Sequence, residues 1–436
     1  MGIAYGRVER FHDDQLVVAL PDLDVVTWAL DRLGVRLGPI EHNADLGLAL
    51  LRDLANVDAA VHTLQQDTDI EPELARAGQE LARSGVPQVA PLDLLVRGVQ
   101  LQFARIFPGW KVTIGKNHRP SPVKGYPHFG GEGTGDPEPT DATLAQSGPG
   151  PGRNHELGRG VRVGLLDTRM FPDAWLTGRY IARPEYLLDP GQDIFTVFDG
   201  HCAFVGSCIL QQAPAAELHV RPVLDSENDG SAWDAAIAMA EVARAGVDVV
   251  NLSFGEIRTD DDSAPMVLET AVKRFGPETV VVAAAGNNGE AKNLPPELVH
   301  DGLEPNSASY PAALVDVIGV GALDQSGQRA AFTPHPAPWI ALLAPGVGLT
   351  GAYVRGEVTI EHKDKNGKIL DAREVSFPGT AVWEGCSFAA GVVSGAIAAG
   401  TVPGHRSARQ ALDGLLHPDP GKPGGHIRPN SLASPG

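Results

Sequence analysis

The chain is poor in several residue types, and each shortage argues against a class of protein. Only three cysteines occur in 436 residues, so no disulfide framework is implied and a reducing compartment is the simplest interpretation. Basic residues number 35 against 54 acidic ones, and the net charge of −19 argues against binding to nucleic acid or to an anionic membrane. No apolar run has membrane-spanning length, and no secretory signal is visible at the start. We therefore expect a cytoplasmic protein with no nucleic-acid partner and no membrane partner.

The composition is that of a globular protein interrupted by a segment rich in Pro and Gly. Hydrophobic residues make up 43% of the chain, which is enough to bury a sizeable core. Residues 118–152 hold seven Pro and eight Gly, a composition typical of extended chain that does not order itself. We predict an N-terminal domain over 1–117, a linker over 118–158, a second domain over 159–416 and a disordered tail over 417–436.

The N-terminal segment has the pattern of a small α+β domain. Apolar strands are predicted at 16–20 and 35–40, on either side of a helix over 24–33. The remaining predicted elements are helices at about 46–65, 71–84 and 93–106 and a strand at 110–114.

The second segment alternates strands with helices, which predicts an α/β domain with a parallel sheet and helices on both faces. Its first strand, at 161–166, is almost continuously apolar, as expected for a strand covered on both faces. The other predicted strands lie at 217–223, 247–252, 279–284 and 315–320, and the predicted helices at 203–211, 231–245, 265–275 and 387–400. A charged β-hairpin with an Asn-Gly turn is predicted at 354–377.

Four short motifs carry residues that could act together in catalysis. They place an acid at the end of a strand, a histidine at the start of a helix, an amide in a turn and a serine at a helix start: Asp167, His201, Asn287 and Ser387. Each has an ordinary structural explanation when taken singly, as a helix cap, a turn residue or a buried side chain. Their order, Asp then His then Ser on an α/β scaffold, is one of the known arrangements of a nucleophilic triad.

These motifs resemble the subtilisin family of serine peptidases over about residues 159–416. Further matching tracts lie at 249–255, 309–312, 317–322 and 344–346. The resemblance implies a subtilisin-like three-layer parallel sheet with helices on both faces, in addition to the small N-terminal α+β domain. It also implies a serine endopeptidase that hydrolyses peptide bonds through an acyl-enzyme, with a peptide or protein as substrate.

The resemblance assigns a role to each residue of the site. His201 would accept the proton of Ser387, Asp167 would hold the imidazole in one tautomer, and Asn287 would donate to the oxyanion. The substrate would lie as an added strand between two walls, formed by Ser253, Phe254 and Gly255 on one side and Ala284, Ala285 and Gly286 on the other. No cofactor and no metal site are expected, because the segment after His201 is too short for the calcium loop of many relatives.

The sequence departs from the family pattern beside the catalytic positions, at Arg169, Cys202, Cys386 and Gly391. These changes favour limited processing or regulatory substrates, and they leave open an alternative: a catalytically weak or inactive binding module that kept the fold. The N-terminal domain also has two interpretations. It is either a prodomain in intramolecular contact with the peptidase cleft, or a retained domain that regulates activity or recruits substrate.

Overall fold

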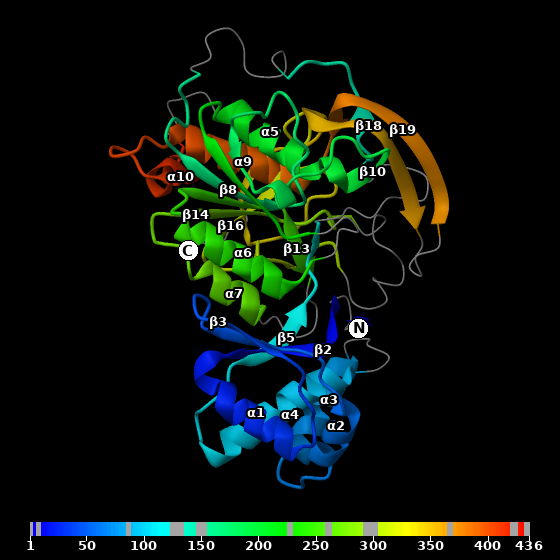
Figure 1. Cartoon of the computed structure of the whole chain (residues 1–436). Coiled ribbons are helices and arrows are strands. Elements are labelled where there is room, and N and C mark those ends of the chain that lie inside the picture. The colour runs from blue at the N-terminus through cyan, green and yellow to red at the C-terminus, as the bar shows by residue number, and fades with distance from the viewer. Residues whose placement is uncertain are drawn as a thin grey trace.

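The computed structural model describes most of the chain (Figure 1). The described residues are 3–5, 10–83, 89–122, 135–144, 155–224, 230–257, 264–290, 304–363, 369–418 and 426–430. Within these ranges no helix is both long and apolar enough to cross a membrane.

The N-terminal unit is an antiparallel sheet with its helices on one face (Figure 1). The strands are β1 (Ile3–Tyr5), β2 (Arg10–Ala19), β3 (Ile40–Asn43), β4 (Leu48–Leu51) and β5 (Ile114–His118). They run in the order β1-β2-β4-β3, and β5 also pairs with β2. The helices are α1 (Leu23–Arg32), α2 (Val57–Gln65), α3 (Glu71–Arg83) and α4 (Pro91–Ile106), with a 3-10 turn η1 (Leu20–Asp22) before α1.

Three elements of this unit differ from the sequence prediction. The helix predicted over 46–65 is strand β4 followed by helix α2, because a short apolar run with every residue buried has no periodicity that separates strand from helix. The strand predicted at 35–40 begins only at Ile40, and the strand predicted at 110–114 begins at Ile114.

The second unit is built on an eight-stranded sheet in the order β20-β17-β16-β14-β12-β8-β11-β9. The strands are β8 (Arg162–Asp167), β9 (Tyr180–Ile181), β11 (Glu217–Pro222), β12 (Val249–Leu252), β14 (Val280–Ala284), β16 (Val317–Leu323), β17 (Ile340–Pro345) and β20 (Arg428–Pro429). All neighbours are parallel except β20, which runs antiparallel to β17.

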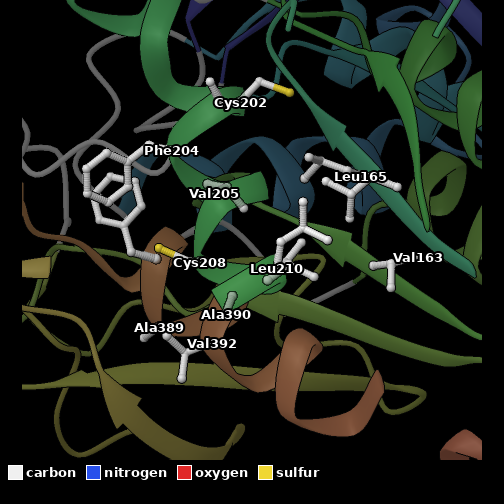
Figure 2. Packing of buried hydrophobic residues seen from close by; sticks show 14 of the residues in the cluster. Val163, Leu165, Cys202, Phe204, Val205, Cys208, Leu210, Ala389, Ala390 and Val392 are labelled. Atoms are coloured by element: carbon white, nitrogen blue, oxygen red, sulfur yellow. The ribbon is translucent and has the colours of Figure 1, made fainter. Parts of the chain in front are cut away.

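Helices cover both faces of this sheet, which confirms the predicted three-layer α/β fold. Val249 packs into the core with α5 (His201–Gln212) and α9 (Cys386–Gly400), whereas the next residue, Val250, packs into the core with α6 (Ala232–Arg244) and α7 (Met266–Val272). Figure 2 shows side chains of β8, α5 and α9 meeting in the first of these cores. The remaining helical elements are η2 (Pro184–Tyr186), η3 (Val197–Gly200) and α10 (Ala408–Leu416).

A long hairpin extends from the sheet and leads back to the start of α9. Its strands β18 (Leu349–Lys363) and β19 (Ile369–Trp383) are longer than predicted, and β10 (Ile194–Thr196) pairs with β18. The predicted Asn-Gly turn lies outside the described residues. Because β19 ends at Trp383 and α9 begins at Cys386, the hairpin fixes the chain just before Ser387.

Parts of the predicted linker and tail are paired strands, which corrects the expectation that both are unstructured. In the linker, β6 (Ser121–Pro122) pairs with β13 (Phe254–Ile257), and β7 (Glu138–Pro139) pairs with β19. In the tail, β20 pairs with β17 and the adjacent Asn430 is buried. Composition could not indicate this, because the hydrogen-bonding partners are edge strands far away in the sequence. The small strand β15 (Ser309–Tyr310) pairs with β13 as well.

The sheet of the N-terminal unit rests on α6 and α7 of the second unit (Figure 1). Val17, Leu48 and Leu50 share one hydrophobic core with Trp233 and Val267. The two units are therefore joined by a continuous apolar contact.

Polar contacts at the same junction specify how the units dock. The side-chain Oδ1 of Asn117 accepts the backbone N–H of Trp233 at 3.0 Å, in the first turn of α6. The indole Nε1 of Trp233 donates to Glu41 Oε1 at 3.0 Å. Since each bond joins the N-terminal sheet to a fixed point on α6, the orientation of the sheet is set.

Candidate active site

The carboxyl end of β8 and the start of α5 bring an acid and a histidine into contact. Asp167, the last residue of β8, is fully buried, and its Oδ1 lies 2.7 Å from Nδ1 of His201. The same oxygen accepts the backbone N–H of Thr168 at 2.7 Å, which fixes the carboxylate. With Nδ1 donating to the carboxylate, the other ring nitrogen of His201 is the one that can accept a proton.

Aromatic rings enclose the imidazole of His201, which is 3% exposed. The Trp383 ring lies perpendicular to it with centroids 5.7 Å apart, and the rings of Phe198 and Phe388 lie at 6.0 and 5.5 Å. These rings exclude water and restrict rotation of the imidazole. Because Phe388 directly follows Ser387, the same contact brings the start of α9 beside His201.

Ser387 is the second residue of α9, and a buried polar network holds its backbone. The hydroxyl of Ser253 donates to the Ser387 carbonyl at 3.3 Å and accepts from Asn251 Nδ2 at 2.8 Å. Ser394, two turns further along α9, donates to Asn251 Oδ1 at 3.0 Å. The network therefore links β12 to α9 at two points along the helix.

Asn251 and Ser394 were not singled out from the sequence, although both are fully buried. The sequence feature that could have identified Asn251 is an amide in the middle of an apolar strand, Val249-Val250-Asn251-Leu252. A polar side chain buried in such a strand requires a hydrogen-bonding partner. The partner is not recognisable from local sequence, because Ser394 is 143 residues away.

Asn287 lies just beyond β14, and its carboxamide is oriented toward the segment before Ser387. Its Oδ1 accepts the backbone N–H of Cys386 at 3.0 Å. Its Nδ2 lies 3.6 Å from the position that a Cβ on Gly385 would occupy. Anchoring the carbonyl oxygen thus places the donor end of the amide next to the start of α9, as an oxyanion donor requires.

The first predicted substrate wall includes the start of strand β13, and another segment of the same chain pairs with this strand. Ser253 and Phe254 are fully buried, and the hydroxyl of Ser253 belongs to the network behind α9. The free edge of β13 is occupied by β6 of the linker, with Gly255 opposite Ser121 in antiparallel register. The position assigned to a bound peptide by the resemblance is therefore held by the chain itself.

The second predicted wall lies at the end of β14. Ala284 is the last residue of that strand and pairs with Val320, and Ala285 donates its backbone N–H to the Val320 carbonyl at 2.9 Å. Gly286 follows with a φ of 110°, a conformation that favours glycine. None of the described strands pairs with these three residues in the way that β6 pairs with β13.

Three of the four altered neighbours of the candidate catalytic positions, Cys202, Cys386 and Gly391, lie in the core. Cys202 and Cys386 are fully buried, and burial raises the pKa of the Cys386 thiol to about 11. A Cβ on Gly391 would lie 3.1 Å from Cys208 Cβ, so the close contact between α9 and α5 accounts for glycine there. The structure gives no account of Arg169. Among the described residues, no group of three or more His, Cys, Asp or Glu side chains could hold a metal ion.

A parallel α/β sheet, a buried Asp–His pair and a serine-bearing helix beside it are features of the subtilisin-type serine hydrolases, and the order Asp, His, Ser distinguishes these from the α/β-hydrolases. A sequence profile described as the Subtilase family matches residues 196–401, a range that contains His201, Asn287 and Ser387. Asp167 lies before this range, in the part of the site defined here by its bond to His201.

Curated relatives agree with this assignment. Subtilisin Savinase of Lederbergia lenta is 33% identical over 202 residues, which cover 45% of this chain and 67% of that protein. The thermostable alkaline protease of Halalkalibacterium halodurans is 31% identical over 205 residues, which cover 45% of this chain and 50% of that protein. The match thus spans about half to two thirds of these relatives. The chain belongs to the subtilase family.

A solved structure shows the same fold. Fervidolysin from Fervidobacterium pennivorans, a keratinolytic enzyme related to subtilisin, superposes with a TM-score of 0.52 at 15% identity. The superposition covers 90% of this chain and 55% of the fervidolysin chain. At this identity the likeness concerns the fold alone.

Proposed function

We propose that the protein is a serine endopeptidase that hydrolyses peptide bonds through an acyl-enzyme. The observation that carries the proposal is the buried 2.7 Å contact between Asp167 Oδ1 and His201 Nδ1, next to the start of α9. A serine hydroxyl is a weak nucleophile, so a base must take its proton as it attacks the carbonyl carbon. His201 is the base for Ser387 in this scheme, and Asp167 stabilises the imidazolium that forms.

Attack by Ser387 converts the substrate carbonyl into an oxyanion that needs donors. The Asn287 amide and the backbone N–H of Ser387, at the positive end of α9, supply them. The imidazolium of His201 then gives its proton to the leaving amine, and the acyl-enzyme remains. Water activated by His201 hydrolyses this ester and restores the free serine.

Labelling with a fluorophosphonate probe tests the assignment. Wild-type protein should react at Ser387, and Ser387→Ala should lose both labelling and peptidase activity while its circular dichroism spectrum stays the same. Unaltered activity in the pure variant would refute the assignment. If the wild-type protein is not labelled even when the probe can reach Ser387, the alternative is favoured: a binding module that kept the fold.

The N-terminal unit is proposed to act as a prodomain that places the linker in the cleft. Strand β5 leads directly into β6, which lies on β13, the strand assigned to the substrate by resemblance. Beyond the undescribed residues, Gly135 donates to Glu384 Oε1 at 3.0 Å and accepts from Trp383 Nε1 at 2.9 Å, just before α9. Described parts of the linker thus contact both β13 and the chain that leads into α9.

Intact mass measurement separates the two interpretations of the N-terminal unit. A prodomain predicts that the wild type cuts itself between about residues 109 and 159, whereas Ser387→Ala remains full length. A wild-type chain that stays intact and is fully active would favour a retained domain that regulates activity or recruits substrate.

The breadth of substrates and the location in the cell are further parts of the proposal. The aromatic enclosure of His201 and the linker strand on β13 restrict access, which supports a few processing or regulatory substrates. The number of cleavage sites can be counted by comparing the peptides of cells that carry the wild-type protein with those of cells that carry Ser387→Ala. A cytoplasmic location is supported by the three buried, unpaired cysteines and is tested by fractionation of tagged cells.

A further inference from the structure

Glu256 of β13 is a buried acid that faces a basic side chain from the N-terminal unit. Its Oε2 lies 3.5 Å from Nδ1 of His118, the last residue of β5, and the two side chains are only 3% and 6% exposed. A carboxylate removed from water in this way is stable when a cationic or hydrogen-bond-donating group lies beside it. The position therefore selects for a basic partner.

Strand pairing locates this acid relative to the catalytic serine. Ser121 of β6 lies opposite Gly255 in antiparallel register. On β13 the chain before Gly255 leads to Ser253, whose hydroxyl contacts the carbonyl of Ser387. A peptide in the place of β6 thus approaches Ser387 as its residue numbers rise, and Glu256 lies at the side where the peptide enters.

Backbone bonds hold this entering segment independently of its side chains. The carbonyl of Pro120 accepts the backbone N–H of Gly230 at 3.0 Å, on the side of the segment away from β13. Backbone bonds of this kind form with any sequence, so they supply affinity, and the side chains that reach pockets supply specificity. Glu256 is the charged group that receives the side chain two residues before Pro120.

We propose that Glu256 is a specificity-determining residue, which forms a subsite for a basic side chain three residues before the substrate residue that pairs with Gly255. In the structure His118 occupies this subsite. The enzyme would therefore select peptides with Arg, Lys or His at that position. The proposal rests on the proposed peptidase function and names its substrate class.

Lys116, another charged group near this segment, has a different partner. Lys116, on the same strand as His118, is 2.6 Å from Asp93 and lies over the ring of Phe11. The ring of Phe11 also borders His118, with centroids 6.3 Å apart, and offers no charge. Glu256 is thus the acid that the structure places against the basic side chain.

Matched peptides test the subsite directly. Fluorogenic peptides that carry the sequence of residues 114–128 are made with Arg or with Gln in place of His118. We expect kcat/KM to be about tenfold higher for the Arg peptide, the discrimination typical of one charge-assisted contact. In Glu256→Gln the ratio should fall to about one, and Glu256→Lys should prefer a third peptide with Glu at this position. The exposed Glu185→Gln is the matched control and should keep the wild-type ratio.

A wild-type ratio near one, or a ratio that survives in Glu256→Gln, would overturn the proposal. A second measurement separates this failure from failure of the peptidase function. In full-length Ser387→Ala, Glu256→Lys should speed hydrogen exchange in residues 114–122 at least tenfold, and added His118→Glu should restore protection. No change in exchange would refute the subsite. If the wild-type protein is not labelled by the fluorophosphonate probe, the peptidase function is refuted instead. The exchange measurement on Glu256→Lys with His118→Glu would still test the role of Glu256.

Discussion

Asn287 is held through one polar atom, and the other lies beside the start of α9, the position of the proposed oxyanion donor. Its Oδ1 accepts the N–H of Cys386 at 3.0 Å, which sets the plane of the carboxamide. Asn287→Ala should lower kcat about a hundredfold or more with little change in KM, because the oxyanion exists only beyond the ground state. Steady-state kinetics on one peptide would check this. A rise in KM alone would assign Asn287 to substrate binding instead.

Cys386 adjoins Ser387, the proposed nucleophile, but is buried. A position at a helix N-terminus lowers a thiol pKa, yet desolvation dominates here and raises the pKa of Cys386 to about 11. Burial likewise raises the pKa of the Cys202 thiol. Because both thiols are buried, the structure predicts that a bulky thiol reagent does not inactivate the native protein.

We therefore expect the native protein to react with an aromatic disulfide reagent at pH 8 far more slowly than the denatured protein, in which all three thiols react. Activity should persist during the slow phase. Cys386→Thr serves as the control, and it should be active and equally insensitive. Fast, stoichiometric modification with loss of activity would show that Cys386 is accessible.

At the scale of elements, the contact between α5 and α9 depends on glycine at the crossing. A Cβ on Gly395 would lie 2.4 Å from the Ile209 carbonyl oxygen and 3.0 Å from its Cα. Both atoms are backbone, so no side-chain rotation can relieve the clash. The helices must separate if a larger residue is introduced, and α9 carries Ser387.

Gly395→Ala should therefore reduce the free energy of unfolding by about 2 to 3 kcal/mol, as overpacking does in other cores. The urea midpoint should fall accordingly. Gly276→Ala is the matched control, because nothing lies within 4 Å of its added Cβ, and the expected change is below about 0.5 kcal/mol. Equal effects from both variants would show that the crossing is not tightly packed.

At the scale of the whole molecule, the two units are joined by contacts that respond to pH. The pKa of Glu41 is lowered from 4.5, first by the hydrogen bond from the Trp233 indole and then by Arg52. A lowered pKa in the docked state gives stability above about pH 4.5, and this stability is lost as the pH falls through the docked-state value.

Glu41→Gln should lower the free energy of unfolding at pH 7 by under about 1 kcal/mol, because Glu41 is largely solvated and its charge is screened. The difference from wild type should shrink toward zero at pH 3. Urea titrations at both pH values measure it. A difference that stays constant with pH would mean that the charge of Glu41 contributes nothing to docking.

The sequence by itself determined the α/β class and the family, and it supplied the order of the candidate catalytic residues. Alternating strands and helices, and motifs such as Gly385-Cys386-Ser387, are local properties and are visible in one stretch of chain. The prediction of a helix at 46–65 was wrong because it also relied on a local pattern, and a short buried run has no periodicity that separates strand from helix.

Only the tertiary structure decided which distant groups meet. Asn251 is hydrogen-bonded to Ser394, the Trp233 indole is hydrogen-bonded to Glu41, and β6 pairs with the edge of β13. The two partners are far apart in the sequence in each case. Composition predicted a free linker because Pro and Gly disfavour regular structure, but an unpaired strand edge nearby supplies the missing hydrogen bonds. Buried polar groups and strand edges are satisfied by whatever the fold brings to them, and that is a property of the assembled chain.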